Sequence, residues 1–316
     1  MNERADEVFL AASLYYVQGE TMDAIARQLR ISRSTVSRLL KQARETGVVQ
    51  ITLTDPAGPR SSLADQLGRR FGVRAHVVPV RDGSSDVHRL DRVARAAGQL
   101  VSEAITDDMV VGTAWGTTLA SVVQHLHPRL VQDTTVVQMN GAASATGSGM
   151  PHVEAINQCF AKAFGSQVVP FPVPAFFDHA ETKQAMWRER SVRRVLALHQ
   201  QIGLALFGVG GLAAELPSHV YANGYLDSDD MQQLDEHQVV GDVNTVFLRE
   251  DGTWADIPLN ARASGIPPNQ LRRIPRRICI VAGTAKVAPL RGALRAGVAT
   301  DVVLDEATAR ALVERS

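Results

Sequence analysis

From residue 75 onward, short apolar runs alternate with helical patterns, and this alternation restricts the fold more than any other feature of the sequence. The runs are continuous in hydrophobicity, which is typical of strands that are buried on both faces of a sheet. Strands are predicted at 75–80, 109–114, 134–139, 167–171, 204–209, 243–248 and 277–281. Helices are predicted at 63–71, 87–105, 117–125, 153–164, 181–199, 285–296 and 306–314. The pattern predicts an α/β domain in which helices flank a parallel sheet.

The first 46 residues have a different pattern and predict three short helices. In the segments 21–30 and 33–46, apolar residues recur at helical spacing, with Thr21 and Ser32 as N-caps and Gly47 as a stop. Residues 48–54 are rich in β-formers and predict a wing strand. Two helices joined by a tight turn are typical of a helix-turn-helix, so this segment is predicted to be an all-α, winged helix-turn-helix.

Basic residues are concentrated on these two helices, although the 33 basic and 33 acidic residues of the whole chain cancel. Residues 24–44 contain six Lys or Arg and no Asp or Glu. Hydroxyl and basic side chains on the outer face of the second helix are of the kind that reads the major groove, while rim arginines neutralise phosphates. The alternative is a helical bundle with a solvated basic face. The residues predicted to contact double-stranded operator DNA are Arg27, Arg33, Ser34, Thr35, Ser37, Arg38 and Lys41.

Composition and length define the domains and exclude several classes of protein. The 316 residues suffice for about two domains, and DPAGPRSS at 55–62 reads as a linker between a DNA-binding domain at 1–54 and an α/β domain at 63–316. Two cysteines form no disulfide framework, and nine histidines show no metal-ligand spacing, so no metal or cofactor is predicted. We expect a cytoplasmic protein that does not enter the membrane, because no apolar stretch is long enough to span one.

Several segments resemble the SorC family of sugar-responsive bacterial regulators. They are LYYVQGETMDAIARQLRISRSTVSRLLKQARETGVVQITL, VVGTAWGTTLASVVQHL, VVQMNGA, LFGVGGL, GDVNTVFLREDG and IVAGTAKVAPLRGALRAGVATDVVLDEATARALV. The likeness covers nearly the whole chain in the family's order. It implies a Rossmann-like effector domain similar to sugar-phosphate isomerase and deaminase folds, and assembly as a homodimer or homotetramer. The expected function is regulation of a carbohydrate or polyol operon by a bound sugar, polyol or sugar phosphate.

The segment 110–119 contains the first predicted effector-binding residues: Gly116, Thr117 and Thr118. A strand, a glycine turn and a helix start leave backbone N–H groups exposed to an anion or a hydroxyl. A plain capped turn would give the same glycine pattern. The resemblance implies that this loop holds the phosphate end of the effector, or its equivalent.

Lys286 and Asp242 are the next candidates. A cation in the first turn of a helix opposes the helix dipole, and a bound anion would compensate for it. A carboxylate accepts hydrogen bonds from polyol hydroxyls. The resemblance assigns effector contacts to both positions. The alternatives are a solvent-facing lysine and an aspartate that stabilises a turn.

Gln138 and Asn140 follow another predicted strand, at the edge where ligands collect in open α/β sheets. The loop 141–149 is predicted to close over the site. Some family members carry a basic residue at the position of Asn140. Its absence here excludes covalent capture of the effector at this position, so a free sugar or polyol remains a possible effector. Trp115 is expected either to stack on a sugar ring or to belong to the core.

The rival function is a sugar-phosphate isomerase or deaminase. Catalysis would need a general base over the sugar carbon, and no pair of carboxylates, Asp242 and Glu154 included, has convincing spacing. The first 50 residues would also have no role in such an enzyme, so we expect a regulator without catalytic residues. A third reading is a DNA-binding protein whose α/β domain only oligomerises.

Overall fold

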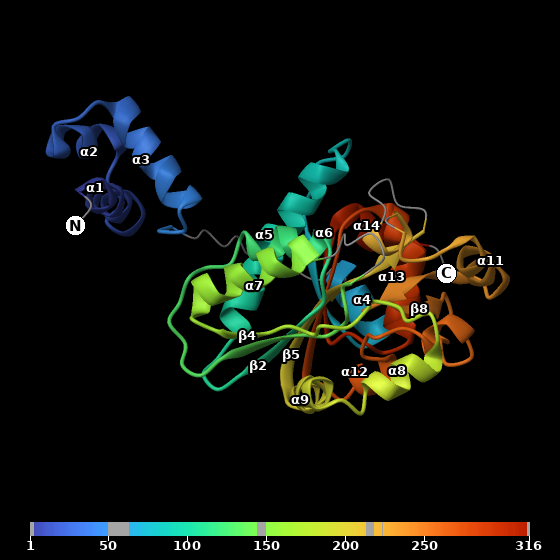
Figure 1. Ribbon diagram of the computed structural model, residues 1–316. Coiled ribbons are helices and arrows are strands. Elements are labelled where there is room, and N and C mark those ends of the chain that lie inside the picture. The colour runs from blue at the N-terminus through green and yellow to red at the C-terminus, as the bar shows by residue number, and fades with distance from the viewer. Residues whose placement is uncertain (1–2, 50–62, 144–149, 213–217, 223, 315–316) are drawn as a thin grey trace. The chain divides into compact units, whose positions relative to one another are not determined.

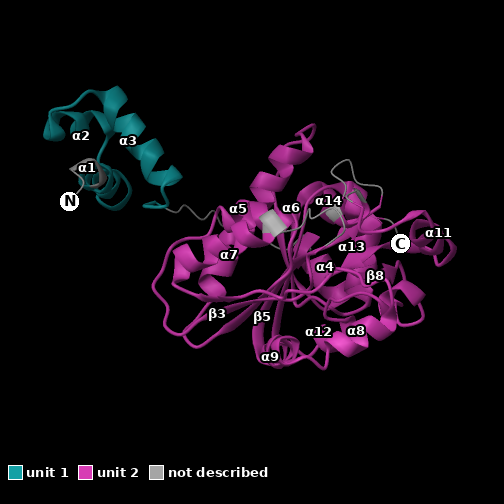
Figure 2. Ribbon diagram, in the orientation of Figure 1, with its two compact units in different colours: residues 1–60 teal, residues 61–316 magenta. Residues whose placement is uncertain are grey.

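The computed structural model describes residues 3–49, 63–143, 150–212, 218–222 and 224–314. The chain divides into two compact units, Met1–Arg60 and Ser61–Ser316, which Figure 2 shows in separate colours. The first unit begins with α1 (Glu3–Ala12), which continues into a π-helical turn, η1 (Ser13–Val17). Two further helices follow, α2 (Met22–Leu29) and α3 (Arg33–Glu45). The three helices predicted in this region are therefore confirmed.

Helices α2 and α3 begin at the predicted caps. The hydroxyl of Thr21 accepts a hydrogen bond from the backbone N–H of Ala24 at 3.2 Å, and that of Ser32 accepts from Thr35 at 3.1 Å. Each such cap is worth about 1 kcal/mol of helix stability. Arg30, between the helices, takes the left-handed conformation with φ 53°. The inward stripe of α3 packs with α1 and α2 in one apolar cluster; its members on α3 are Val36, Leu39, Leu40 and Ala43.

The predicted wing strand at 48–54 is not found at Val48 and Val49, which both lie in a bend rather than a strand. Residues 50–54, and with them the rest of the predicted wing, lie outside the described residues, as does the predicted linker at 55–62.

The second unit is built on a seven-stranded sheet with the order β1-β10-β9-β5-β2-β3-β4 (Figure 1). Every neighbouring pair in it is parallel. The strands are β1 (Arg74–Val78), β2 (Val110–Thr113), β3 (Thr135–Gln138), β4 (Gln167–Val169), β5 (Ile202–Gly208), β9 (Arg276–Val281) and β10 (Asp301–Asp305). This confirms the predicted parallel sheet and six of the seven predicted strands.

Helices cover both faces of this sheet, as the sequence predicts. Along β5, Leu204 and Leu206 join the cluster with α5 (Asp86–Ala104), α6 (Thr117–Val123) and α7 (Met150–Phe164). Ala205 and Phe207 point to the opposite face and join a second cluster. That cluster includes residues of α4 (Leu63–Phe71), α9 (Arg190–His199), α12 (Pro268–Leu271), α13 (Val287–Arg295) and α14 (Glu306–Glu314). The continuous apolar runs of the sequence are therefore strands buried on two sides.

The predicted strand at 243–248 is wrong, because a hairpin turn divides this run. Asn244 and Thr245 have φ values of 51° and 63°, and positive φ at both central residues is the mark of a tight hairpin turn. The flanking strands β7 (Val239–Val243) and β8 (Val246–Arg249) pair antiparallel, and β6 (Gly210–Gly211) completes a small second sheet. The turn is followed by η2 (Pro258–Ala261) and preceded by α10 (His219–Ala222) and α11 (Ser228–Glu236).

A predicted helix that is divided and a strand that was not predicted are further differences. The helix predicted at 181–199 is two helices, α8 (Ala180–Met186) and α9, with a break before Arg190. The strand β10 was not predicted, since its apolar core of three residues is flanked by Asp301 and Asp305. Both aspartates are fully buried and are held by tertiary partners.

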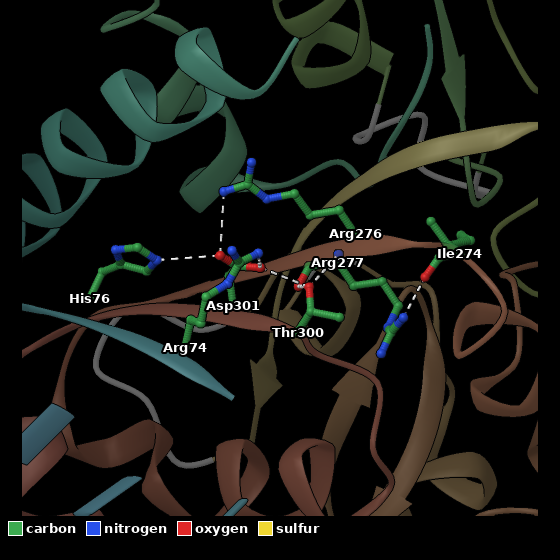
Figure 3. Close-up of polar contacts among 7 residues, drawn as sticks. All are labelled: Arg74, His76, Ile274, Arg276, Arg277, Thr300 and Asp301. Carbon is green, nitrogen blue, oxygen red and sulfur yellow. Dashed lines mark hydrogen bonds and ion pairs between the residues drawn. The ribbon is translucent and has the colours of Figure 1, made fainter. Parts of the chain in front are cut away.

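Asp301 organises the amino ends of β1, β9 and β10 (Figure 3). Its carboxylate accepts hydrogen bonds from Thr300, Arg74 and His76 at 2.8, 3.0 and 3.3 Å. Arg276 lies 3.4 Å away on the neighbouring strand. Burial opposes ionisation, but these hydrogen bonds and the charge of Arg276 hold the pKa of Asp301 well below its usual range. The cluster joins three strands at their amino ends, and the carboxyl ends of the strands lie at the opposite edge of the sheet.

Candidate functional site

A cavity lies at the carboxyl ends of the central strands, where ligands bind in open α/β sheets. It encloses about 940 Å³ of space, part of which is open to solvent. Its walls come from the segments that follow β2, β3, β5 and β9, and from the β7–β8 hairpin. The predicted residues that line it are Gly116, Thr117, Thr118, Asn140, Asp242 and Lys286. Tertiary structure thus brings together six of the seven predicted effector residues, from four separate segments.

Gln138 is the exception. It is buried and is not among the residues that line the cavity. Its amide N–H donates to the carbonyl of Asn140 at 2.6 Å, and its amide oxygen accepts from the backbone N–H of Phe171 at 3.0 Å. Both ends of the side chain therefore hold neighbouring backbone, which positions Asn140 without reaching the cavity.

The loop after β2 has the form that the sequence predicts. Gly116 has φ 136°, a conformation that side chains rarely adopt, and it makes no side-chain cap for α6. The N–H groups of the first turn of α6 therefore need acceptors from outside the helix. Thr117 is exposed and Thr118 is half-buried, and both line the cavity beside these N–H groups.

Asp242 stands on β7 with both carboxylate oxygens engaged. Oδ1 accepts from the Tyr221 hydroxyl at 2.9 Å, and Oδ2 accepts from the backbone N–H of Thr245 at 3.0 Å. Burial raises the pKa of Asp242, while the two hydrogen bonds and the charge of Lys286 oppose that rise. Burial and the neighbouring Asp242 raise the pKa of Tyr221 well above its ordinary value. The carboxylate keeps lone pairs for further donors, because each oxygen has two.

Lys286 supplies the cation of the cavity. It ends the 3₁₀ turn η3 (Thr284–Lys286), just before α13. Its ammonium makes no hydrogen bond or close ion pair with any described residue. Burial lowers the pKa of Lys286, and the charges of Asp242, Cys279 and Asp86 act in the opposite direction. The preceding loop is held in place by Asp305, whose carboxylate accepts from the backbone N–H of Gly283 at 2.8 Å.

Sequence reasoning missed Asn244, which lines the cavity from the hairpin turn. It is 4% exposed, and neither its amide oxygen nor its amide nitrogen has a hydrogen-bond partner among the residues that the structure describes. The Asn in GDVN was visible in the sequence, but a hairpin turn had to be recognised before its side chain could be placed.

Trp115 also lines the cavity and is half-buried. Its indole N–H donates to the carbonyl of Gly141 at 2.8 Å, and its ring lies 5.5 Å from that of Tyr225. The Tyr225 hydroxyl donates to the carbonyl of Ala142 at 2.8 Å. The two aromatic rings thus hold the start of the predicted closing loop, of which residues 144–149 lie outside the described structure.

In the first unit, α3 presents the predicted polar face to solvent. Arg27, Arg33, Ser34, Ser37, Arg38 and Lys41 are exposed, and Thr35 is half-buried. Arg38 donates to the hydroxyl of Thr35 at 3.3 Å, which orients its guanidinium along the helix. Arg33 lies 3.6 Å from Asp23, and Lys41 lies 3.7 Å from Glu45, so the face is less uniformly basic than the sequence suggests. Such exposed pairs are weak and can exchange for phosphates.

The described residues contain neither a candidate metal site nor a candidate membrane-spanning helix. No three His, Cys, Asp or Glu side chains in the described ranges gather where they could hold a metal ion. Among the helices described, none has the length and apolar character needed to cross a bilayer.

Both units match known protein families. Residues 56–314 match the Sugar-bind family of sugar-binding domains, and residues 2–51 match the homeodomain-like domain family. The chain is 35% identical to the deoxyribonucleoside regulator of Bacillus subtilis over 306 residues, which is 96% of each protein. It is 26% identical to the sorbitol operon regulator of Klebsiella pneumoniae, over 99% of this chain and 100% of that one. The chain belongs to the SorC family.

Solved structures of the family have the same fold. A domain of a possible sugar-binding transcriptional regulator from Arthrobacter aurescens is 46% identical, with a TM-score of 0.76, and covers 83% of this chain and all of that one. The full-length sorbitol operon regulator SorC matches with a TM-score of 0.77 at 24% identity, over 99% of this chain. Members of the SorC family are transcriptional regulators with a helix-turn-helix and a sugar-binding effector domain, and they are not enzymes. This chain is such a regulator, and the isomerase reading is set aside.

Proposed function

We propose that the cavity is the effector site and that its occupant is a small sugar, polyol or sugar phosphate. The observation that carries this proposal is the ammonium of Lys286, which faces a cavity without a close ion-pair partner among the described residues. Lys286 is half-buried, and a partly buried charge without a partner is unfavourable, so a ligand oxygen would compensate for it.

The ligand-binding roles divide along the cavity. The N–H groups of the loop from Gly116 to Thr118, together with Lys286, offer donors to a phosphate or to an electron-rich hydroxyl. Asp242 offers acceptors to hydroxyl protons, with Tyr221 and the Thr245 N–H holding its geometry. Asn140 and Trp115 complete the wall, and Gln138 acts by holding the backbone of Asn140.

The DNA-binding role falls to the exposed face of α3 and to Arg27 on α2. We propose that Ser34, Ser37 and Arg38 reach base edges in the major groove, while Arg27, Arg33 and Lys41 contact phosphates of double-stranded operator DNA. Thr35 serves mainly to orient Arg38. A homodimer or homotetramer would place two recognition helices on two half-sites.

Effector binding regulates by favouring one arrangement of the units in this oligomer over another. The expected coupling free energy between effector and DNA is about 1–3 kcal/mol, or roughly 5- to 150-fold in DNA affinity.

The proposal is tested by a thermal-shift screen of the full-length protein. Relatives are named for sorbitol, erythritol and deoxyribonucleosides, so the panel contains polyols, pentoses, hexoses and their phosphates. A ligand well above its dissociation constant raises the melting temperature by mass action. The compound that does so should also change the affinity for operator DNA in a gel shift. A panel in which nothing stabilises the protein, or a stabilising compound without effect on DNA binding, would contradict the proposal.

A further inference from the structure

In the described residues, three buried polar atoms without a hydrogen-bond partner belong to two residues that line the effector cavity. They are Oδ1 of Asn140 and both Oδ1 and Nδ2 of Asn244. The two residues are 2% and 4% exposed. Buried amide groups in folded proteins nearly always have partners, and leaving one unmade costs more than a hydrogen bond normally contributes. The described structure therefore holds two amides that lack hydrogen-bond partners and border the cavity.

Neither amide is needed to hold the fold. The backbone at Asn140 is already fixed by the bond from Gln138 to its carbonyl and by the bond from the Gly141 N–H to the Ser264 hydroxyl at 2.9 Å. Asn260 shows how a structural amide differs. Its oxygen accepts from the Phe247 N–H at 2.8 Å, and its nitrogen donates to two backbone carbonyls at 2.8 and 3.0 Å.

The turn explains only why residue 244 is an Asn. With φ 51°, it is left-handed, a conformation that Asn and Gly tolerate better than other residues. Its own carbonyl accepts from the Thr245 hydroxyl and packs against Gly265, where a Cβ would lie 1.6 Å from that oxygen. A Gly would satisfy the turn equally well, so the turn leaves the direction and burial of the amide unexplained.

We propose that Asn140 and Asn244 form an amide pair that reads hydroxyl groups at the uncharged end of the effector. The inference rests on the proposed function of the cavity and specifies the class of its ligand. Oδ1 of Asn140 needs a donor, and the amide of Asn244 needs a donor and an acceptor. Two neighbouring hydroxyls supply all three, because each hydroxyl donates one proton and accepts through its lone pairs.

Other chemical groups fail at this end of the cavity. A phosphate dianion or a carboxylate has no proton for the two amide oxygens, and an aldehyde or ketone can only accept. An anionic group therefore belongs at the other end, beside Lys286 and the N–H groups that follow Gly116. The effector is a polyol or sugar whose far end carries at least two free hydroxyls, with or without a phosphate at the near end.

The experiment uses the full-length protein and a panel of erythritol, ribitol, sorbitol, ribose, 2-deoxyribose and the 5-phosphates of the two pentoses. Dissociation constants are measured by calorimetry for each compound that stabilises the wild type. The variants are Asn140→Leu, Asn140→Asp and Asn244→Gly, and Asn269→Leu, at an exposed position of α12, is the matched control. Circular dichroism and melting temperature check that each variant folds.

We expect Asn140→Leu and Asn244→Gly to weaken binding by about tenfold or more, since each leaves ligand hydroxyls without partners. Asn140→Asp keeps an acceptor and should weaken binding less than Asn140→Leu does. The control Asn269→Leu should bind like the wild type. Wild type should also prefer ribose and its 5-phosphate to the matching 2-deoxy compounds, and Asn140→Leu or Asn244→Gly should lose that preference.

Two results would overturn the amide pair while leaving the effector cavity standing. One is wild-type affinity in both Asn140→Leu and Asn244→Gly. The other is a greater loss in Asn140→Asp than in Asn140→Leu, which would mean that an anionic group meets Asn140. If no compound in the panel stabilises the wild type, the proposed function itself fails. Should a variant not fold, the comparison of hydroxylated and deoxy ligands on the wild type still decides, because equal affinities would contradict the proposal.

Discussion

A Cβ atom on Gly210 would lie 1.8 Å from Oδ1 of Asp242, on the neighbouring strand β7. Gly210 has an ordinary backbone conformation, so the absence of a side chain, rather than a special φ, is what this position requires. The same oxygen accepts the hydrogen bond from Tyr221. The small sheet beside the cavity can therefore hold Asp242 in place only because glycine faces it.

Replacing Gly210 by alanine should displace the Asp242 carboxylate. We expect the Gly210→Ala variant to lose about 1–3 kcal/mol of folding stability through overpacking and to bind the effector at least about tenfold more weakly. Calorimetry and urea unfolding measure the two effects. Gly203→Ala is the matched control, because its Cβ would meet no atom closer than 3.7 Å. Unchanged effector affinity in Gly210→Ala would show that Asp242 does not contact the ligand.

Replacing Lys286 by methionine keeps the volume of the side chain and removes its charge. The variant should lose the response to effector while retaining affinity for operator DNA, and its apo form should be about 1 kcal/mol more stable near pH 7. The pKa of Lys286 is lowered in the fold, so its charge destabilises the native state most at neutral pH and less as pH rises. The stability advantage of Lys286→Met should therefore shrink toward alkaline pH. A normal effector response would remove Lys286 from the site.

Replacing Arg38 by alanine should weaken operator binding by about 1–3 kcal/mol and leave effector binding intact. Its guanidinium is exposed and oriented by Thr35, as a base-reading side chain needs to be. Gel-shift titrations at fixed salt measure the loss on operator fragments selected from genomic DNA. Arg188→Ala, an exposed arginine of the second unit, serves as the control. Equal affinities of Arg38→Ala and wild type would contradict the placement of the DNA-binding face.

Asp301 should stabilise the protein in a pH-dependent way. Its pKa is depressed in the fold, so its contribution is present above the ordinary aspartate pKa of about 3.9 and is lost as pH falls toward the folded value. Asp301→Asn should cost about 1–3 kcal/mol at pH 7, because the donors from Arg74, His76 and Arg276 lose a charged acceptor. Urea unfolding between pH 7 and about pH 2 tests this, because the loss falls below the ordinary aspartate pKa, and the exposed Asp235→Asn is the control. A penalty that stays constant as pH falls below 4 would contradict the assignment.

Much of the fold could be predicted, because local patterns carry it. The stripe of Val36, Leu39 and Leu40 and the caps Thr21 and Ser32 are local, and the structure confirms the helices that they predict. The continuous apolar runs likewise indicate strands buried on two faces. The prediction errors occur where residues distant in sequence determine the local structure. In β10, Arg74 and Arg89 compensate the charges of two buried aspartates that lie far along the chain.

The candidate site was predicted less completely, for the same reason. Gln138 and Asn140 are two residues apart, yet one holds backbone and the other faces the cavity. No periodicity distinguishes these roles, since the difference depends on where Phe171 presents its N–H group. Asn244 was missed because its role depends on a hairpin turn inside an apolar run.

The sequence by itself determined most of the helices and strands, the family and the chemical types available, since caps, apolar periods, glycine turns and basic clusters act over a few residues. Only the tertiary structure decided which of these side chains meet in one cavity. It brought Lys286, Asp242, Asn140 and Asn244 together from separate segments. Within the described part of the chain, it left the ammonium of Lys286 without a close ion-pair partner and the amide of Asn244 without a hydrogen-bond partner. Such environments depend on the packing of distant segments rather than on neighbours in sequence.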